Sequence, residues 1–291
     1  MNSPSTTRFV LITGASSGIG QACALHLASR GYHVLAGVRK PADYESLAAR
    51  GEPTLQPIVL DVTDPESIGR AIDKVSAIVG ECGLSSLINN AGITVAGPVE
   101  LLDVQQWREQ YEVNVLGVVA VTRAALPLLR TGCGRILNIG SISGCYGLPF
   151  LGPYASSKSA LAIISQSLRV ELRPWNLQVT LVRLGNIETP IWQRSEQRGD
   201  ELWQRVPPQE QVKYAERLAG FRALALNGPC SPPEVVTRAV EKILSKRRAP
   251  RICRVGRNSL AIPLFGAIVP GRVRDWLIDK ALRRQAAKHK S

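Results

Sequence analysis

Residues 11–22 read LITGASSGIGQA, and this stretch decides the fold. The apolar run at 8–12 predicts a buried strand, and the run IGQACALHLAS at 19–29 predicts a helix. Gly14, Gly18 and Gly20 lie in the turn between them, where glycine lets the backbone pass close to a ligand. The helix N-terminus beyond them suits a phosphate group. The spacing G-x-x-x-G-x-G is not the G-x-G-x-x-G fingerprint, so the turn alone leaves open a tight βα turn that binds nothing.

Apolar runs and amphipathic helices alternate through the following residues. Helices are predicted at 65–80, 104–129 and 153–173, and further strands at 33–38, 55–62, 86–92, 134–141, 177–185 and 251–256. This alternation is typical of right-handed βαβ units, which build a parallel sheet with helices on both faces. We therefore predict an α/β protein with a doubly wound, Rossmann-type parallel sheet of about seven strands, in one domain over residues 1–258.

Two segments depart from the alternation. Residues 190–233 are charged and are broken by VPPQ and CSPP, which predicts a mobile lid of short helices. Residues 259–291 are predicted to form a basic amphipathic tail. From Lys246 onward the chain holds thirteen of its 36 Lys and Arg residues but only two of its 23 acids, so most of the net charge of +13 lies at this end.

Composition argues against several classes of protein. No uninterrupted apolar run of about 18 residues occurs, and the N-terminus lacks the apolar core of a signal peptide. Six scattered cysteines without a CxxC motif fit reduced thiols better than a disulfide framework. Three histidines without ligand spacing predict no metal centre, and no nucleic-acid-binding module is recognisable. We expect a cytoplasmic globular protein.

The stretch GPYASSKSA, residues 152–160, places Tyr154 four residues before Lys158. On a helix this spacing puts both side chains on one face. A tyrosine with a pKa of about 10 is a poor proton donor or acceptor near pH 7 unless a neighbour changes it. Taken alone, the pair is better explained as an accident of a helix surface than as a catalytic pair.

Six motifs in order change that reading. They are TGASSGIG at 13–20, LDVTD at 60–64, NNAG at 89–92, VNVLG at 113–117, SIS at 141–143 and YASSK at 154–158. With them the chain resembles the short-chain dehydrogenase/reductase family, in its single-domain branch. The segments VLAGVRK, GLPF and RVGRN look most like the hydroxysteroid and retinol dehydrogenase group.

The resemblance implies a catalytic tetrad of Asn114, Ser141, Tyr154 and Lys158. Tyr154 is the expected acid and base, and Lys158 is expected to lower its pKa and to hold the nicotinamide ribose. The Ser141 hydroxyl is expected to hydrogen-bond the reacting oxygen. Asn114 is expected to anchor a water that links Lys158 to solvent.

The resemblance also implies a dinucleotide cofactor. NADP(H) is preferred over NAD(H), because Val38 stands where NAD-preferring members carry an acid and the cations Arg39 and Lys40 follow. Leu184 departs from the family pattern, which has a proline there to stiffen the turn under the nicotinamide. The expected cofactor-binding residues are Gly14, Ser16, Ser17, Gly18, Ile19, Gly20, Arg39, Lys40, Asp61, Val62, Asn90, Ala91, Gly92, Tyr154, Lys158, Gly185, Ile187 and Thr189.

The expected substrate is a small lipophilic carbonyl compound or alcohol, of steroid, retinoid or similar type. Ser141 and the apolar side chains of Tyr146, Leu148, Phe150 and Trp192 are expected to line its site, although Leu148 and Phe150 could instead pack in the core. The alternatives are a 3-oxoacyl thioester reductase and a non-catalytic NADP-sensing protein. An intact tetrad speaks against the latter.

The tail raises a separate question. Its apolar stretch SLAIPLFGAIV, 259–269, precedes a segment in which Val273, Trp276, Leu277 and Leu282 fall near one helix face. Such a helix can lie peripherally on a membrane surface, or it can fold back onto the domain or a partner subunit. Relatives are commonly dimers or tetramers through the helices at 104–129 and 153–173, so a homo-dimer or homo-tetramer is expected.

Overall fold

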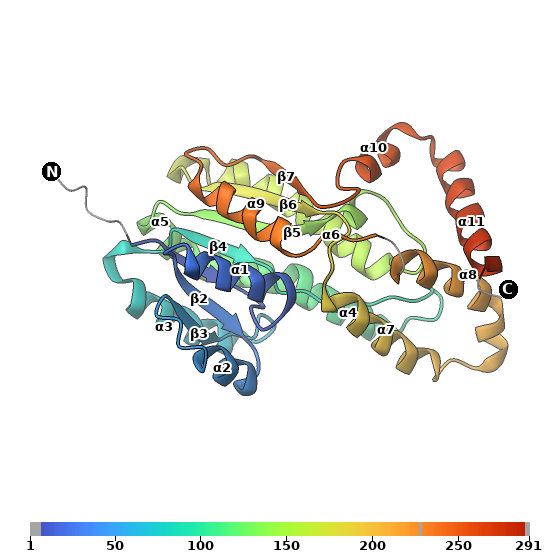
Figure 1. The fold of residues 1–291 in the computed structure, drawn as a ribbon, viewed down its shortest axis with the longest axis horizontal. Helices are drawn as coiled ribbons and strands as arrows, with labels where there is room; N and C mark the ends of the chain where they lie inside the picture. Colours follow the sequence, from blue (N-terminus) through green and yellow to red (C-terminus); the bar gives the residue numbers. More distant parts are fainter. Residues whose placement is uncertain (1–6, 227–228, 289–291) are drawn as a thin grey trace.

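A seven-stranded sheet organises the chain in the computed structural model, which describes residues 7–226 and 229–288. Predictions that reach residues 1–6, 227–228 and 289–291, within the N-terminal lead, the lid and the tail, lie outside the described residues. All neighbouring strands are parallel, in the order β3-β2-β1-β4-β5-β6-β7 (Figure 1). The strands are β1 Phe9–Ile12, β2 His33–Val38, β3 Leu55–Val59, β4 Ser86–Asn89, β5 Arg135–Ser141, β6 Gln178–Leu184 and β7 Ile252–Val255.

Helices follow nearly every strand, as the alternation predicts. The α-helices are α1 Gly18–Ser29, α2 Pro41–Ala48, α3 Pro65–Val79, α4 Val104–Tyr111, α5 Gly117–Thr131, α6 Gly152–Glu171, α7 Pro190–Trp203, α8 Pro208–Leu226, α9 Glu234–Ser245, α10 Ala261–Ile268 and α11 Gly271–Lys288. The short helices are η1 Gly80–Cys82, η2 Glu112–Leu116, η3 Ile142–Cys145 and η4 Arg173–Trp175. The predicted α/β doubly wound fold is confirmed.

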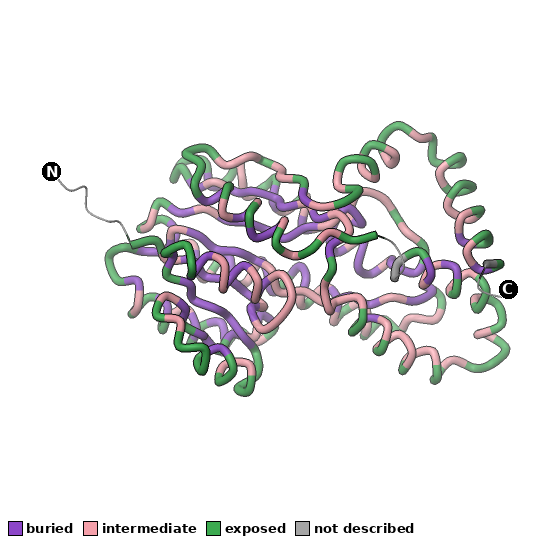
Figure 2. Tube along the Cα trace, viewed as in Figure 1, coloured by how far each residue is buried: buried purple, intermediate pink, exposed green. Residues whose placement is uncertain are grey.

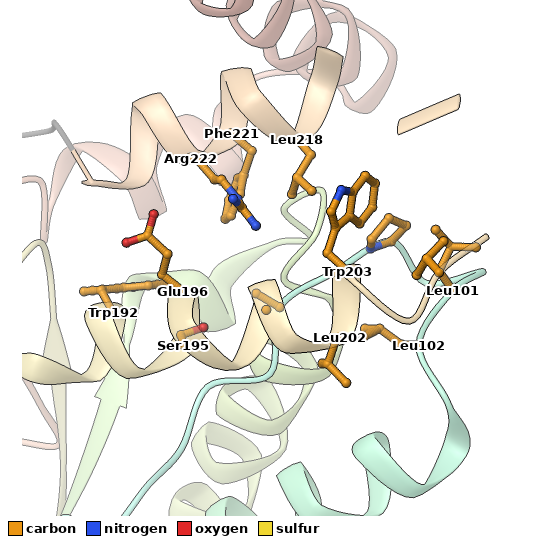
Figure 3. Close-up of a pocket in the computed structure, with 15 residues that line it drawn as sticks. Leu101, Leu102, Trp192, Ser195, Glu196, Leu202, Trp203, Leu218, Phe221 and Arg222 are labelled. Carbon is orange, nitrogen blue, oxygen red and sulfur yellow. The ribbon is translucent and has the colours of Figure 1, made fainter. Parts of the chain in front are cut away.

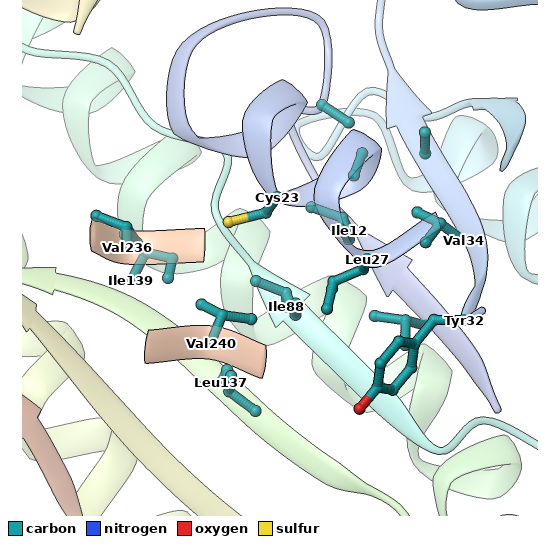
Figure 4. Close-up of a cluster of buried hydrophobic side chains, with 14 of the residues drawn as sticks. Ile12, Cys23, Leu27, Tyr32, Val34, Ile88, Leu137, Ile139, Val236 and Val240 are labelled. Carbon is teal, nitrogen blue, oxygen red and sulfur yellow. The ribbon is translucent and has the colours of Figure 1, made fainter. Parts of the chain in front are cut away.

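The sheet is buried on both faces, which is why its strands are continuous apolar runs (Figure 2). Adjacent residues of β1 show the two faces: Ile12 packs under α1 and α9, and Leu11 packs under α3 and α5. The α1 and α9 side adds Leu27, Ile88 and Val240 (Figure 4). Packing in these two cores holds the strands in place. It therefore also sets the position of the edge at which the carboxyl ends of the strands lie.

The strand order reverses beside β1. After β1 the chain builds β2 and β3 on one side, then crosses to β4 on the other. Just beyond the end of β1 the backbone is still hydrogen-bonded to β4, because the Thr13 N–H donates to the Ile88 carbonyl at 3.0 Å. Ligands of open α/β sheets bind at such a switch point, outside the carboxyl ends of the strands.

The lid and the tail pack together. The lid contains two helices of several turns, α7 and α8, so the prediction of short helices is wrong. Helix α11 lies along α8, and its residues Leu282 and Ala286 are buried there. In Figure 2 most of α10 and α11 is nevertheless exposed or half-buried. The fold-back alternative therefore describes the end of α11, while its first half keeps an apolar surface.

One helical stretch, Val104–Thr131, is long and apolar enough to cross a membrane by length and composition. It is made of α4, η2 and α5, and α5 packs beside α3 and β4. Val121, Ala125 and Leu129 are fully buried in the core under the sheet. A helix that covers a sheet in this way meets the same length and composition test as a membrane span.

Candidate active site

Tyr154 and Lys158, from the stretch GPYASSKSA, lie on the first two turns of α6. Pro153 favours the helix start, and both side chains are only 6% exposed, which excludes a surface pair. The Lys158 Nζ lies 5.8 Å from the centroid of the Tyr154 ring and donates to the Ile139 carbonyl at 2.9 Å. Ser141, the last residue of β5, forms a hydrogen bond with the Tyr154 side chain. A strand end and a helix start thus bring three predicted residues together.

Burial dominates the protonation of this group. It raises the pKa of Tyr154, and the hydrogen bond from Ser141 opposes that rise only in part. Burial also lowers the pKa of Lys158 to about 8. The raised pKa keeps Tyr154 as the neutral phenol near pH 7. The expectation that the Lys158 ammonium lowers this pKa stays a prediction. A neutral phenol is a proton donor.

Asn114 lies in a π-helical turn, η2, that interrupts the long helix between α4 and α5. Its Oδ1 accepts from the Ile93 N–H at 2.9 Å, and its Nδ2 donates to the Ile93 carbonyl and to Ser157 Oγ. Ser157 Oγ in turn donates to the Tyr154 carbonyl at 2.7 Å. Asn114 is fully buried and positions the strand-end loop and α6; π turns are common at functional sites.

The glycine turn is held in shape by contacts from the next strand. Gly14 has φ +65°, and a Cβ there would lie 2.8 Å from the Cα of Ala91. The Asn90 amide donates to the carbonyls of Thr13 and Gly14, both at 3.0 Å. The Thr13 Oγ1 accepts from the N–H groups of Asn90 and Ala91. The turn therefore needs glycine for packing as well as for any ligand.

A cleft of about 580 Å³ runs from this turn to the tyrosine. Arg39 and Lys40 lie at its rim after β2, and Trp192 lines it from α7. Leu184 also lines it, so the residue that replaces the family proline faces the same space. Of the expected site residues it is lined by Gly14, Ser16, Ser17, Gly18, Ile19, Gly20, Arg39, Lys40, Asp61, Val62, Asn90, Ala91, Gly92, Ser141, Tyr154, Lys158, Gly185, Ile187, Thr189 and Trp192.

The donor set of the cleft fits a phosphorylated dinucleotide. Thr94 lines the cleft, is 4% exposed, and its Oγ1 has no hydrogen-bond partner, as expected of a group that meets a ligand. Arg194 and Arg198 of α7 add cations to those of Arg39 and Lys40. Two acids, Asp43 and Asp61, also line it; the Asp61 carboxylate accepts from the N–H and hydroxyl of Thr63. Cations outnumber acids along the walls.

Three of the expected substrate residues lie elsewhere. The Tyr146 ring contacts Phe265 of α10, with centroids 6.1 Å apart, and Arg274 lies over the ring. Phe150 is buried and contacts Phe221 of α8 at 5.5 Å, and Leu148 is half-buried. None of these three lines the cleft. Trp192 does, with its ring 5.9 Å from that of Tyr154 in an edge-on arrangement.

Sequence reasoning missed several residues of the site. Thr13 positions the turn and stands directly before the first glycine, so TGASSGIG held the signal. Thr94 gave no signal in the sequence. The predicted lid pointed to Trp192, but Arg194 and Arg198 were missed because the sequence alone does not show which side chains of α7 face the cleft. Among the described residues no three metal-ligating side chains converge.

Comparisons with known proteins find relatives that match most of this chain. Residues 8–200 match the family model described as short chain dehydrogenase. The chain is 33% identical to retinol dehydrogenase 5 of Mus musculus, covering 97% of this chain and 91% of that one. It is 31% identical to the NADPH-dependent 3-dehydrocapnine reductase of Ornithobacterium rhinotracheale, covering 95% and 98%. A solved short-chain dehydrogenase from Burkholderia cenocepacia in complex with NADP superposes with a TM-score of 0.71 at 27% identity, covering 93% and 97%.

Proposed function

The chain belongs to the short-chain dehydrogenase/reductase family and is an oxidoreductase of CH–OH and C=O groups, and on that premise we propose an NADP(H)-dependent enzyme for a lipophilic substrate. The convergence of Ser141, Tyr154 and Lys158 at the end of one cleft supports this most strongly. In reduction the Tyr154 hydroxyl gives its proton to the carbonyl oxygen, and Ser141 donates a hydrogen bond to the same oxygen. When bound, NADPH would supply the hydride.

Lys158 has two proposed tasks. As an ammonium it stabilises the phenolate that Tyr154 becomes after giving its proton, and it donates to the ribose of the cofactor. Its present partner, the Ile139 carbonyl, leaves donors of the ammonium free for these contacts. Asn114 is proposed as a positioning residue that keeps α6 and the loop at Ile93 in register, and as the anchor of a water on the proton path.

The choice of NADP(H) rests on charge. Arg39 and Lys40 follow β2 at the rim of the cleft, and the buried Val38 places no carboxylate there to repel a 2′-phosphate. The NADPH-dependent relative and the NADP-bound structural neighbour support the same cofactor. NAD(H) stays the alternative.

The test is a panel of carbonyl compounds offered to the protein with NADPH. Apolar ketones and aldehydes are expected to be reduced, and Tyr154→Phe is expected to lose turnover by about 10²-fold or more while NADPH still binds. Near-normal turnover of that variant refutes the mechanism. Acyl thioesters belong in the panel, because their preferred reduction identifies a 3-oxoacyl thioester reductase. Tight NADPH binding with no turnover at all identifies a sensing protein.

Two further assignments are proposals. Leu116 next to α5 and Ile163 and Val170 on α6 are exposed apolar residues, which supports association of two copies through these helices. On the tail, Leu264 and Ile268 lie at helical spacing on α10, and Leu260 directly precedes that helix. Val273, Trp276 and Leu277 lie at helical spacing on α11, and all six side chains are exposed. We propose that this tail surface touches membranes peripherally.

A further inference from the structure

Two arginines lie directly opposite each other on the last two strands of the sheet. Arg183 of β6 is paired in register with Arg254 of β7, and neighbouring strands are only about 4.8 Å apart. Val182 and Val255, their neighbours in the chain, pack in the core under α1 and α9. Because side chains alternate along a strand, both arginines lie on the other face of the sheet, where α6 packs on β6.

Neither guanidinium has a partner that balances its charge. Arg183 is half-buried, and its Nε is enclosed by the protein without a hydrogen-bond partner. Arg254 is exposed on the edge strand. No acid of residues 7–226 and 229–288 forms an ion pair with either of them. Like charges held side by side repel, so the pair lowers the stability of the fold unless an anion neutralises it.

We propose that Arg183 and Arg254 form a binding site for a phosphate monoester, carried by a soluble molecule or by a lipid head group. A guanidinium can donate two parallel hydrogen bonds to phosphate oxygens. A phosphate monoester carries a charge close to −2 near pH 7, which balances two arginines, whereas a carboxylate balances one. The inference goes beyond the proposed function, since it requires neither NADPH nor a carbonyl substrate.

The segment after β5 and the tail border this site. Both arginines act through their charge on Cys145 of η3, where they oppose the rise that burial causes in the pKa of the thiol. The ring of the next residue, Tyr146, lies 5.3 Å from the Arg274 guanidinium of α11. Arg274 donates to the Gly266 carbonyl and lies 3.9 Å from the Asp275 carboxylate, so this third cation already has partners. The two strand arginines are therefore the cations that a phosphate would neutralise.

The site is separate from the spaces around the catalytic residues. Neither arginine lines the cleft or the small cavity between α7 and α8, whose side chains face each other in Figure 3. The site is nevertheless near the catalytic strand end, because Gly140 pairs with Arg183 and Ser141 with Leu184. Phosphate binding at the arginines can therefore be measured while the cleft holds its cofactor.

The two sources of phosphate differ in what else they touch. Helix α10 packs on η3 and exposes Leu264 and Ile268. A lipid can therefore place its head group at the arginines and its acyl chains along α10. A soluble phosphate monoester needs only the arginines.

The first test removes both charges. Arg183→Gln combined with Arg254→Gln is compared with Arg238→Gln combined with Arg247→Gln, which removes two exposed cations on and after α9. Glycerol 3-phosphate is titrated into each protein by isothermal titration calorimetry, with and without NADPH. We expect the first pair of changes to raise its Kd at least tenfold, because charge-assisted contacts are lost. The control pair should bind like the wild type, and both keep the cations of the cleft.

Thermal unfolding gives a second readout and checks that the variants fold. Glycerol 3-phosphate at a hundredfold excess over its Kd is expected to raise the Tm of the wild type by about 5 °C, because it binds the folded protein alone. The same concentration should move the Tm of the Arg183→Gln, Arg254→Gln protein much less. If that protein does not fold, Arg254→Gln alone, at an exposed position, is expected to weaken binding less but in the same direction.

The lipid source has its own arm. Phosphatidic acid is a phosphate monoester and phosphatidylglycerol a diester, so vesicles of each, at matched surface charge, separate recognition of the monoester from general attraction to anionic lipid. If the ligand is a lipid, the wild type co-sediments several-fold more strongly with phosphatidic acid. The Arg183→Gln, Arg254→Gln protein should then lose this preference, while the control pair keeps it.

The outcomes decide both the site and its ligand. Loss of glycerol 3-phosphate binding only in the Arg183→Gln, Arg254→Gln protein supports the site, and an added loss of the preference for phosphatidic acid identifies the lipid source. Equal binding by both pairs of variants in both assays overturns the site, as does a wild type that binds neither probe. These readouts need no turnover, so a protein that reduces no carbonyl compound would refute the proposed function without affecting them.

Discussion

At the scale of single residues, burial decides the chemistry of the site. Lys158 is enclosed beside Tyr154, and its pKa is lowered to about 8. The amine is therefore protonated below pH 8 and neutral above it, well before a free lysine would lose its charge. We predict that kcat/KM for NADPH is flat below pH 8 and falls about tenfold per pH unit above it, because this parameter reports the free enzyme.

Lys158→Arg is the control for that profile, since a guanidinium stays charged throughout the range. Any activity that this variant keeps should show no decline beginning near pH 8. A wild-type profile that stays flat to pH 9.5 contradicts the assignment of the charge to Lys158.

The cofactor preference also depends on one residue. Arg39→Asp replaces a cation at the cleft rim with an acid, and we predict that the ratio of kcat/KM for NADPH to that for NADH falls by about tenfold to a hundredfold. Arg70→Asp on α3 makes the same charge change away from the cleft and should leave the ratio unaltered. A ratio that moves equally in both variants places the 2′-phosphate elsewhere.

At this scale the sequence could predict which residues meet, from their spacing along the chain. Tyr154, Lys158 and Ser141 meet because a strand end and the start of the next helix always lie at one sheet edge. Tyr146 and Phe150 were predicted in the substrate site from their place between Ser141 and Tyr154, but side-chain direction depends on distant elements. Their rings are covered by Phe265 and Phe221, which come more than 70 residues later. The burial of Tyr154 could not be predicted for the same reason, because burial is a property of the folded chain.

At the scale of elements, β6 and β7 meet at a point that admits no side chain. Gly185 follows β6, its N–H donates to the Val255 carbonyl at 2.8 Å, and a Cβ there would collide with the Arg257 carbonyl. We predict that Gly185→Val lowers the free energy of unfolding by about 3 kcal/mol, through overpacking against backbone that cannot move aside. Thermal unfolding followed by circular dichroism measures the change.

Gly69→Ala is the matched control. Gly69 is exposed within α3, and a Cβ there meets nothing within 4 Å. Alanine should stabilise this helix by about 0.5–1 kcal/mol. Equal midpoints of thermal unfolding for Gly185→Val and Gly69→Ala would mean that the backbone at Arg257 moves aside without a loss of stability.

The elements themselves were largely predictable. Apolar runs bounded by glycine and proline located all seven strands, including β7, because a strand buried on both faces must be apolar. The π-helical turn at Asn114 was not predicted, since it adds a residue to a helix whose apolar pattern stays intact. The length of the lid helices was also missed; their polar residues pair with one another and with other segments, as Arg222 does with Asp200 and Arg198 with Glu109.

At the scale of the whole molecule, some apolar residues of the tail pack on α8 and others are exposed to solvent. The sequence placed Leu282 on one helix face with Val273, Trp276 and Leu277, and left open whether that face meets the domain or a membrane. In the structure Leu282 packs on α8, while Val273, Trp276 and Leu277 are exposed. Helix–helix crossing explains this, because a straight α8 can cover only one end of α11.

The exposed end has the chemistry of a peripheral membrane surface. Trp276 is 58% exposed and has the Lys280 ammonium 4.7 Å from its ring centroid, and Arg272 and Arg284 are exposed nearby along the helix. Aromatic and aliphatic side chains flanked by cations suit the boundary between head groups and acyl chains. Each cation near an anionic surface adds about 1 kcal/mol before screening by salt.

We predict that the full chain co-sediments with vesicles containing anionic lipid at low salt, and much less with neutral vesicles. Trp276→Asp combined with Leu264→Asp should strongly weaken this, because two of the six exposed apolar side chains of the tail become acids while the packing of Leu282 on α8 is kept. Val212→Asp, at an even more exposed apolar site on α8, should pellet like the wild type. Full retention of the double variant on anionic vesicles would mean that Trp276 and Leu264 do not hold the protein there, and negligible pelleting of the wild type would rule out membrane contact through the tail.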